Sequence, residues 1–309
     1  MTDATDRTNA TWMRWLARRY AALRAFSLPV SVLPVPLAAA VAVPPGQWRW
    51  GVLIASAVGA GLLHAAGNLL NDYFDFRSGV DRKVEGDEGR PGRLLVRGEL
   101  RPADVLAEAM VCLVLAGAMA AYLIWQCGPG LLWFALVAVA ALYAYTGPPL
   151  KLKYHAMGEG LIFLVFGPVL MAGAAYAQTG RLEIGVLLVS VPVGLATTAI
   201  LVGNNLRDLH EDGAAGIRTL VHVAGPGATR LLYVLLVVLC VAGVAALGAV
   251  GRLPRAVIAA PLLLALLRRP LAAVWRHERL PDIDARTAQF ETVLLLALLA
   301  AVVIARTLA

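Results

Sequence analysis

The chain contains nine apolar segments, and most of them are long enough to cross a lipid bilayer as a helix. Crossing a hydrocarbon core of roughly 30 Å takes about 20 apolar residues, and the backbone polar groups in that core must be satisfied internally. The sequence therefore predicts an all-α, polytopic membrane protein built as a bundle of about nine helices. The predicted spans are 25–44, 50–71, 104–126, 130–146, 158–178, 184–205, 228–249, 255–274 and 288–308.

Composition supports this fold class and excludes others. The 309 residues are 60% hydrophobic and 15% charged, whereas soluble proteins carry about 25% charged residues. The net charge of +7 comes without a basic helix interleaved with aromatic residues, so the sequence does not predict nucleic-acid binding. The three cysteines lie singly in or beside apolar segments, a pattern that predicts neither a zinc site nor a disulfide framework.

The distribution of basic residues predicts how the chain is oriented. Nine spans with a cytoplasmic N-terminus place 22 of the 27 Lys and Arg residues on the cytoplasmic side, which follows the positive-inside rule. We expect residues 1–24 to form a cytoplasmic arm with an interfacial helix, and residues 25–309 to form one transmembrane domain in the cell membrane. The polar stretches 75–103 and 206–227 show no helical periodicity and are expected to be cytoplasmic loops over the active site.

Prolines predict irregular spans. Pro29, Pro34 and Pro36 fall within the first span, and Pro168 and Pro192 fall within later ones. Each removes a helical hydrogen bond, so neighbouring helices must stabilise the kinks. The eighth span is the weakest because Pro261 interrupts it.

The second span ends in a cluster of amides and carboxylates. Asn68, Asp72 and Asp75 are spaced i, i+4 and i+7, so they share one helix face, and Asn71 is four residues before Asp75. Carboxylates at the end of a membrane helix are costly unless a partner satisfies them. Hard oxygen donors at this density favour Mg²⁺, which typically takes one or two carboxylates together with substrate phosphates.

A second cluster of the same kind closes the sixth span. It comprises Asn204 and Asn205 followed by Arg207, Asp208 and Asp212, with the two aspartates four residues apart. Ordinary helix-end residues in contact with interfacial water are the alternative for any single aspartate. Two such clusters on the same membrane face instead indicate a diphosphate that is held by metal while its apolar tail lies in the membrane.

Basic and aromatic residues near these clusters suit a phosphate ligand. Arg90, Arg93, Lys151 and Arg207 are candidates for binding a diphosphate, Arg as a planar fork and Lys as a point charge. Their alternative role is to set membrane topology. Tyr145 precedes the turn that contains Lys151, where it can donate to a phosphate oxygen, orient an aromatic acceptor or belong to the interfacial aromatic belt.

Three segments together resemble the UbiA superfamily of intramembrane prenyltransferases, and the resemblance spans nearly the whole chain. The first runs from Asn71-Asp72 through Asp75 to Asp81, the second is Tyr145-Thr146-Gly147-Pro148-Pro149-Leu150, and the third runs from Asn204 through Asp208 to Leu220. The residues of these three segments are similar to those of the branch that prenylates 1,4-dihydroxy-2-naphthoate in menaquinone biosynthesis. The branch acting on 4-hydroxybenzoate has a third aspartate where this chain has Gly79, and the next aspartate here is Asp81.

The resemblance implies a mechanism and a set of roles. Asp72, Asp75, Asp208 and Asp212 would bind Mg²⁺, and they would act in catalysis with Lys151 and Tyr145. Diphosphate binding would involve Asn68, Asn71, Arg90, Arg93, Lys151, Asn204 and Arg207. The allylic carbon–oxygen bond of a polyprenyl diphosphate would ionise, and a small aromatic acceptor would attack the cation; for the naphthoate, carbon dioxide would leave. Metal and basic side chains would stabilise the departing diphosphate.

Two kinds of alternative stay open on the sequence. The first is a UbiA-type enzyme with another outcome, either prenylation of 4-hydroxybenzoate, homogentisate or a specialised metabolite, or cyclisation of a terpene. The second is a cation-coupled transporter. Transporter sites lie near the membrane midplane at broken helices, whereas these carboxylates lie at helix ends flanked by basic residues.

Overall fold

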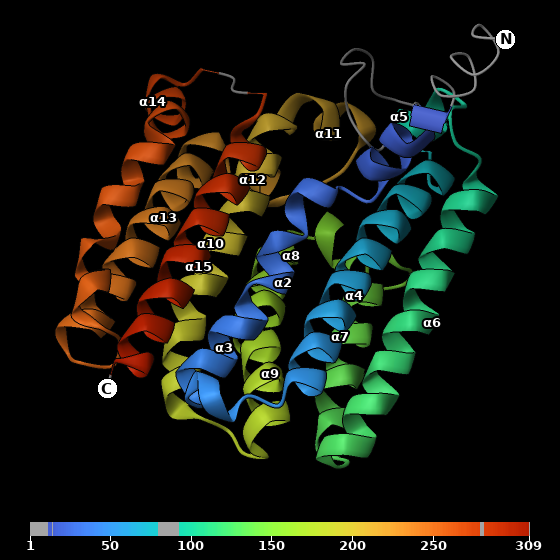
Figure 1. Cartoon of the computed structure of the whole chain (residues 1–309). Coiled ribbons are helices and arrows are strands. Elements are labelled where there is room, and N and C mark those ends of the chain that lie inside the picture. Colours follow the sequence, from blue (N-terminus) through green and yellow to red (C-terminus); the bar gives the residue numbers. More distant parts are fainter. Residues whose placement is uncertain (1–11, 14, 80–92, 279–280, 309) are drawn as a thin grey trace, which may run out of the picture.

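The computed structural model describes residues 12–13, 15–79, 93–278 and 281–308, and these form a bundle of helices whose long members run side by side (Figure 1). Short helices α5, α11 and α12 gather at the end of the bundle that also carries the N-terminal segment, and the C-terminus lies at the opposite end. The first half comprises η1 (Ala25–Ser27), α2 (Pro29–Val32), α3 (Pro34–Ala42), η2 (Pro45–Gln47), α4 (Trp50–Arg77), α5 (Arg93–Val96), α6 (Pro102–Cys127), α7 (Leu131–Thr146) and η4 (Leu152–Tyr154). The second half comprises α8 (Gly158–Leu164), η5 (Val165–Val169), α9 (Leu170–Thr179), α10 (Ile184–Arg207), α11 (Leu209–Ala215), α12 (Leu220–Ala224), α13 (Pro226–Ala249), η6 (Arg255–Leu267), α14 (Arg268–Arg276) and α15 (Ile283–Thr307).

The helical segments coincide with the nine predicted spans. Within the described residues, eight are long and apolar enough to cross a membrane: Ala25–Ala42, Trp50–Arg77, Pro102–Cys127, Gly158–Thr179, Ile184–Arg207, Pro226–Ala249, Arg255–Arg276 and Ile283–Thr307. The predicted fourth span is α7, which is apolar but has only 16 residues. The polytopic all-α fold is therefore confirmed, with one segment shorter than the usual spanning length.

Four of the six prolines named above mark breaks in their spans, whereas Pro36 lies inside α3 and Pro192 lies inside α10 without ending either helix. The first span is divided into η1, α2 and α3, and Pro29 and Pro34 occupy the first positions of α2 and α3. A proline is tolerated there because the amide that it lacks would have no helical partner. Pro168 lies in η5, a single π-helical turn between α8 and α9. Pro261 lies in η6, which is a 3₁₀ helix rather than an α-helix.

Glycine allows the π-helical turn to contact α10 closely. A Cβ atom added to Gly167 would lie 2.7 Å from the carbonyl oxygen of Ser190 and 3.0 Å from the Cα of Gly194. Both distances are shorter than side chains normally tolerate, so the two backbones meet only because both positions are glycine. This approach fixes α8 and α9 against the helix that carries the second polar cluster.

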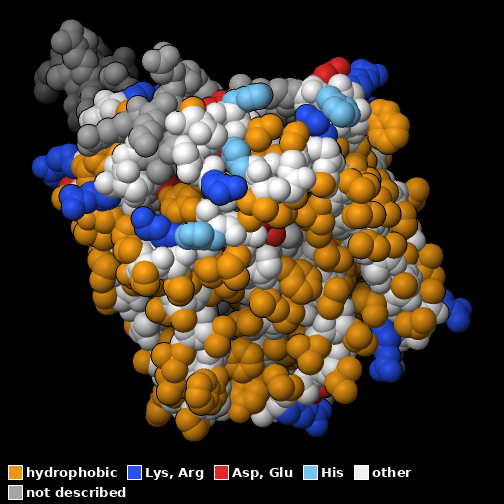
Figure 2. Space-filling view, turned by 180° about the vertical axis from the view of Figure 1, so that it is seen from behind, with side chains coloured by type: hydrophobic (Ala, Val, Ile, Leu, Met, Phe, Trp, Pro, Cys, Tyr) orange, Lys and Arg blue, Asp and Glu red, His pale blue; other side chains and the backbone are white. Residues whose placement is uncertain are grey.

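The long helices present apolar side chains both inward and outward. Tyr233, Phe290, Met171 and Leu37 are fully buried between helices. Trp125 and Trp133, in contrast, are more than 70% exposed on the outside. Figure 2 shows hydrophobic side chains over the middle of the molecular surface, with most Lys and Arg side chains near its upper and lower margins. This is the pattern of a protein that is surrounded by lipid.

The expectation that residues 206–227 lack helices was wrong. They contain α11 and α12, and His222 on α12 contacts the carbonyl oxygen of Leu209 through Nε2 at 3.0 Å. Helices of five to seven residues are too short to show a clear hydrophobic period. Within 75–103, α4 continues to Arg77 and α5 is a single turn. Residues 15–22 are helical within the predicted N-terminal arm, whose interfacial position stays a prediction.

Candidate active site

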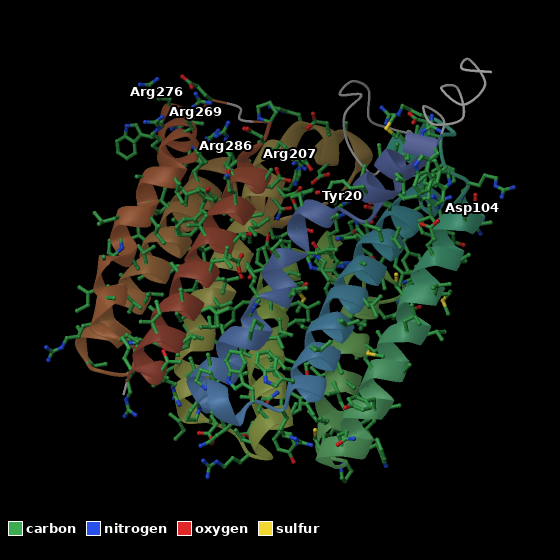
Figure 3. The ribbon with its side chains drawn as sticks, in the orientation of Figure 1. Tyr20, Asp104, Arg207, Arg269, Arg276 and Arg286 are labelled. Carbon is green, nitrogen blue, oxygen red and sulfur yellow. The ribbon has the colours of Figure 1, made fainter. Side chains whose placement is uncertain are left out.

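A cavity of about 880 Å³ lies inside the bundle between α4, α7, α8, α9 and α10. Its lining is polar where α4 and α10 end and apolar where the cavity extends along α6, α7 and α9. Arg207 at the end of α10 lies at the same end of the bundle as Tyr20 and Arg286 (Figure 3). Both predicted clusters contribute to the polar part.

The first cluster occupies one face of α4, as its spacing predicts. Asn68, Asn71, Asp72 and Asp75 all line the cavity, and the helix continues without interruption to Arg77. Asp72 is 4% exposed and Asp75 is 6% exposed. Carboxylates that are buried this deeply must be compensated by positive charge or by hydrogen bonds.

Arg24 compensates Asp72. Its Nη2 lies 2.7 Å from Asp72 Oδ1, although 48 residues separate the two along the chain. Arg24 adopts a left-handed backbone conformation with φ of 49° immediately before the first span. The amide of Asn68 donates to the carbonyl oxygen of the adjacent Leu23 at 3.0 Å. Burial lowers the pKa of Arg24, but Asp72 and Asp75 raise it above its ordinary value, so the guanidinium stays charged.

Lys153 compensates Asp75. Its Nζ lies 2.9 Å from Asp75 Oδ2 and 3.1 Å from Asn71 Oδ1, and the hydroxyl of Tyr154 donates to the other Asp75 oxygen. Burial lowers the pKa of Lys153, but Asp75 and, less strongly, Tyr154 and Tyr145 raise it above its ordinary value. Lys153 therefore carries a fixed positive charge beside the first cluster.

The structure directs Lys153 into the cavity, whereas the sequence analysis favoured Lys151. Lys151 is absent from the cavity lining that the described residues form. It sits at a left-handed position in the turn, with φ of 44°, where its amide donates to Gly147 and its carbonyl accepts from Tyr154. Lys151 thus shapes the turn, and the residue two positions later reaches the carboxylates.

The second cluster is organised by Arg207 at the end of α10. Its Nε and Nη2 donate to the two oxygens of Asp208 at 2.7 and 2.9 Å. It also contacts Asn204 on the same helix and Asp284 at the start of α15. Asp208 separates α10 from α11, and its carbonyl oxygen accepts from the amide of Asp212 at 2.8 Å. The predicted i, i+4 relation of the two aspartates is therefore present, and both line the cavity.

One amide of the second cluster has a packing role. Asn205 is buried and is absent from the described lining of the cavity. Its Nδ2 donates to Glu159 Oε1 on α8 at 2.6 Å, with both groups buried. This hydrogen bond ties α10 to α8.

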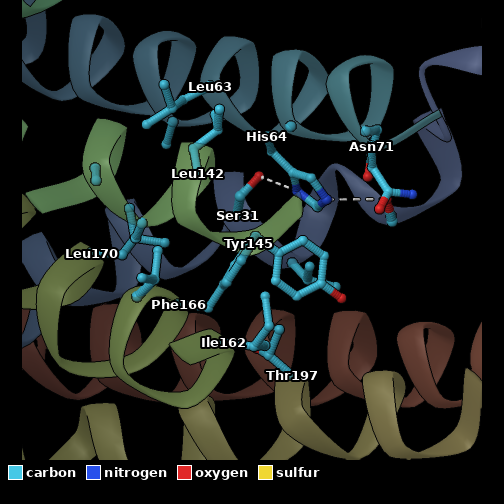
Figure 4. Close-up of a pocket in the computed structure, with 18 of the residues that line it drawn as sticks. Ser31, Leu63, His64, Asn71, Leu142, Tyr145, Ile162, Phe166, Leu170 and Thr197 are labelled. Atoms are coloured by element: carbon cyan, nitrogen blue, oxygen red, sulfur yellow. Dashed lines mark hydrogen bonds between the residues drawn. The ribbon is translucent and has the colours of Figure 1, made fainter. Parts of the chain in front are cut away.

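The remaining predicted residues are placed as follows. Tyr145 lines the cavity beside Phe166 and Ile162 (Figure 4). Arg90 and Asp81 lie outside the described residues, and Arg93 begins α5 without a described side chain. Their predicted roles stay predictions.

Sequence reasoning missed several residues of the site. Arg24 was counted only among the charges that set topology, although it is the last charged residue before the first span. Asp284 shortly precedes the last apolar segment, and a carboxylate at the end of a membrane helix could have marked it as a candidate residue of the site. His64 lines the cavity two helical turns before Asp72, but it belongs to neither of the two sequence clusters.

The donor set fits a magnesium ion that is completed by its substrate. Among the described residues, no three His, Cys, Asp or Glu side chains form a ready-made metal site. Mg²⁺ seldom uses such a cage and typically combines one or two carboxylates with phosphate oxygens. Asp72, Asp75, Asp208 and Asp212 supply carboxylates of this kind around one polar space.

Comparisons with known proteins agree with this architecture. The sequence is 32% identical over 289 residues to UbiA prenyltransferase domain-containing protein 1 of Gallus gallus, covering 92% of this chain and 84% of that protein. The Xenopus tropicalis protein of the same name is 34% identical, with 93% and 82% covered. The structure of a UbiA homolog from Archaeoglobus fulgidus bound to GPP and Mg²⁺ superposes with a TM-score of 0.68 at 17% identity, covering 93% of this chain and 99% of that one. The UbiA prenyltransferase family pattern matches residues 32–290, and the chain therefore belongs to the UbiA prenyltransferase family.

Proposed function

We propose that this membrane prenyltransferase transfers a polyprenyl group from a polyprenyl diphosphate to an aromatic acceptor with the help of Mg²⁺. We further propose that the acceptor is 1,4-dihydroxy-2-naphthoate, which loses carbon dioxide in a step of menaquinone biosynthesis. The observation that carries the proposal is the meeting of two Asn and Asp clusters, one from α4 and one from α10, at the polar end of a single cavity. The rest of that cavity is largely apolar, as a prenyl chain requires.

The polar end would bind the diphosphate. Asp72 and Asp75 face it from α4, and Asp208 and Asp212 face it from the junction of α10 with α11. When bound there, Mg²⁺ neutralises diphosphate oxygens and stabilises the negative charge that develops as the allylic bond breaks. Asn68 and Asn71 add amide groups to the same surface, and either can orient a phosphate or a water molecule.

Three basic side chains at the polar end of the cavity are placed to bind the diphosphate. Arg24, Lys153 and Arg207 are each within hydrogen-bond distance of one cluster carboxylate, namely Asp72, Asp75 and Asp208. If Mg²⁺ were held by the carboxylates, the three basic side chains would direct their donors toward phosphate oxygens. The guanidinium groups match phosphate in a planar, bidentate way, and Lys153 contributes a point charge.

The apolar part would hold the prenyl chain and protect the allylic cation. Leu63, Leu142, Phe166 and Leu170 line it (Figure 4). A cation that forms in such an enclosure meets little water, so it survives long enough to react with the acceptor. Support for a prenyl diphosphate as the donor also comes from the Archaeoglobus fulgidus homolog, which was solved with GPP and Mg²⁺.

The choice of acceptor rests on the sequence motifs. The sequences of the segments around Asp72 and Asp208 resemble those of the enzymes that prenylate the naphthoate. Gly79 occupies the position where the 4-hydroxybenzoate branch has an aspartate. An electron-rich naphthalene ring attacks the allylic carbon through the ring carbon that bears the carboxylate. The bond to the carboxylate then breaks, carbon dioxide leaves, and the electrons of that bond restore the aromatic ring. Described polar residues deeper in the cavity, such as Tyr145, are available to orient the ring.

We also propose that the polar end faces the cytoplasm and that the protein lies in the cell membrane. By the predicted order of spans, the opposite side would carry only Arg49, Arg181, Arg252, Arg255 and Arg306, and the other 22 of the 27 basic residues would fall on the side of the two clusters. This asymmetry is the positive-inside pattern. A phosphatase fused to the C-terminus should be active only outside the cell; a phosphatase that is inactive there would contradict the orientation.

The direct test is product analysis with the purified protein in nanodiscs. The assay supplies Mg²⁺, prenyl diphosphates of several lengths and a panel of aromatic acids, and mass spectrometry identifies the products. A prenylated naphthalenediol that has lost carbon dioxide would support the full proposal. Prenylation of another ring would replace the acceptor, a cyclic hydrocarbon would indicate a terpene cyclase, and no diphosphate release would favour a transporter.

A further inference from the structure

His64 extends the active face of α4 toward the apolar part of the cavity. It precedes Asn68 by four residues and Asp72 by eight, so all three lie on one side of the helix. At a rise of 1.5 Å per residue, the backbone of His64 is about 12 Å from that of Asp72 along the helix axis. His64 therefore lines the cavity farther from the end of α4 than Asp72 does.

Two serines hold the imidazole in place. Nδ1 lies 3.0 Å from the hydroxyl of Ser31 (Figure 4). Nε2 lies 3.3 Å from the hydroxyl of Ser27. The ring also meets Phe166 edge to face, with 5.2 Å between the ring centroids. The orientation of His64 is thus fixed by α2, by η1 and by η5, the turn that contains Phe166.

The hydrogen bonds around His64 leave one of its two ring nitrogens without a hydrogen, so the ring can accept one proton. Ser31 donates its hydroxyl hydrogen to the carbonyl of Leu28 at 2.9 Å, and Ser27 donates to the carbonyl of Arg24 at 2.8 Å. Both serine oxygens therefore face His64 as acceptors. A neutral imidazole has a single N–H, and the shorter contact assigns that hydrogen to Nδ1. Nε2 then presents its lone pair toward Ser27 at the longer contact, and an incoming donor that displaces this contact can hydrogen-bond to Nε2.

The surroundings indicate what that donor is. Leu63, Leu142 and Phe166 make this part of the cavity apolar, and a prenyl chain has no hydrogen to donate to Nε2. The charged groups at the polar end of the cavity, which include Arg24 and Asp212, already have a proposed role in binding the diphosphate. A ring hydroxyl of the aromatic acceptor is the substrate group that both needs a polar partner here and carries a proton.

We propose that Nε2 of His64 binds a ring hydroxyl of the aromatic acceptor and accepts its proton during prenyl transfer. The proposal rests on the proposed aromatic acceptor and makes His64 a catalytic residue. Ser31 is a positioning residue because its oxygen fixes Nδ1–H and leaves Nε2 as the base. After proton transfer, both N–H groups of the imidazolium have a serine oxygen to face.

The step balances without any further reactant. The hydroxyl O–H bond breaks, its proton moves to Nε2, and its electron pair enters the ring. The ring carbon bonds to the allylic carbon, whose bond to oxygen breaks so that the diphosphate leaves with that electron pair. The resulting ketone becomes aromatic again when carbon dioxide, or a proton, leaves the alkylated carbon and its electrons return to the ring. The oxygen then takes the proton back from His64.

The test separates acceptor binding from donor binding. His64→Gln and His64→Ala are compared with the wild type and with His277→Gln, a matched variant of an exposed histidine that is absent from the described lining of the cavity. Three quantities are measured in nanodiscs: turnover with 1,4-dihydroxy-2-naphthoate, equilibrium binding of that acid and of its 1,4-dimethoxy analogue, and binding of geranylgeranyl S-thiolodiphosphate. A thermal melt checks that each variant is folded.

We expect both His64 variants to lose about 10²-fold or more in turnover, the contribution typical of a positioned proton acceptor. Their affinity for the dihydroxy acid should fall, while binding of the thiolodiphosphate and of the dimethoxy analogue should stay at the wild-type level. Ser31→Ala should show a smaller loss in the same readouts, and His277→Gln should show none.

Other outcomes overturn the proposal. Folded His64 variants that keep wild-type turnover and acceptor affinity would remove His64 from the reaction, and variants that lose thiolodiphosphate binding would move it to the donor site. Wild-type protein that does not bind the dihydroxy acid would contradict the proposal as well. Wild-type protein that binds this acid through His64 but forms no prenylated product would refute the proposed function alone.

Discussion

The Nζ atom of Lys153 lies 2.9 Å from Oδ2 of Asp75, which joins the loop after α7 to the end of α4. The side chain of Lys153 is 14% exposed and that of Asp75 is 8% exposed, so the pair is largely shielded from water. A shielded charge pair is costly to break by removing one partner. The contact therefore fixes the position of a cation at the polar end of the cavity, where a diphosphate would bind.

The two lysines of this loop should differ in their effect on donor binding. Lys153→Ala should raise the KM for a prenyl diphosphate by about tenfold or more, because a charge-assisted hydrogen bond contributes about 1.5–3 kcal/mol. Lys151→Ala should have the smaller effect, since Lys151 is absent from the described lining. Steady-state kinetics in nanodiscs measure both variants, and a larger loss with Lys151→Ala would contradict the placement of Lys153.

Removing the metal should stop turnover reversibly. EDTA should abolish release of diphosphate, and added Mg²⁺ should restore it, because the four cluster carboxylates otherwise repel the anionic substrate. A thermal melt gives an independent readout: Mg²⁺ with a prenyl thiolodiphosphate should raise the melting temperature of the wild type. Asp104→Asn, which alters a carboxylate outside the cavity, should keep the full shift. Turnover that persists in EDTA would contradict a role for the metal.

The hydrogen bond between Asn205 and Glu159 should affect stability. Glu159→Ala leaves the amide of Asn205 buried without its acceptor, which typically costs about 1–3 kcal/mol. Glu159→Gln keeps an acceptor oxygen and should lose less. Glu183→Ala is the matched control, because Glu183 pairs with the exposed Arg181 and surface pairs contribute about 1 kcal/mol or less. Unfolding in SDS measures all three, and equal effects of Glu159→Ala and Glu183→Ala would count against the buried link.

A larger side chain in the apolar part of the cavity should change donor preference. Leu170→Trp narrows the space at the start of α9, so kcat/KM for geranylgeranyl diphosphate should fall by about tenfold relative to geranyl diphosphate, equivalent to about 1.4 kcal/mol. Leu164→Trp provides the control, since Leu164 is 52% exposed on the outside. An unchanged ratio in Leu170→Trp would show that the prenyl chain lies elsewhere.

The sequence was sufficient to predict the fold class and the first cluster, because both depend on short-range patterns. Spanning segments follow from apolar length, and the shared face of Asn68, Asp72 and Asp75 follows from the helical repeat. The second cluster was predicted for the same reason. Its aspartates keep their i, i+4 relation even though α10 ends at Arg207 and α11 begins at Leu209.

The partners of these carboxylates could not be predicted in the same way. Arg24 meets Asp72 across 48 residues, and Arg207 meets Asp284 across 77 residues. Such pairs depend on how helices assemble, which periodicity does not encode. The choice between Lys151 and Lys153 depends on the backbone of one turn, where the left-handed conformation of Lys151 brings the later lysine to the cavity.

The most direct test of the account is equilibrium binding of geranylgeranyl S-thiolodiphosphate, which cannot readily ionise, to the wild type and to three variants. We predict Mg²⁺-dependent binding to the wild type and to Asp104→Asn. In folded Asp72→Asn and Asp208→Asn, binding should be weaker by about tenfold or more, as expected when a site loses a charged hydrogen-bonding or metal-binding group. Binding that is independent of Mg²⁺, or unaffected by either substitution, would contradict the claim that the two clusters form one diphosphate site.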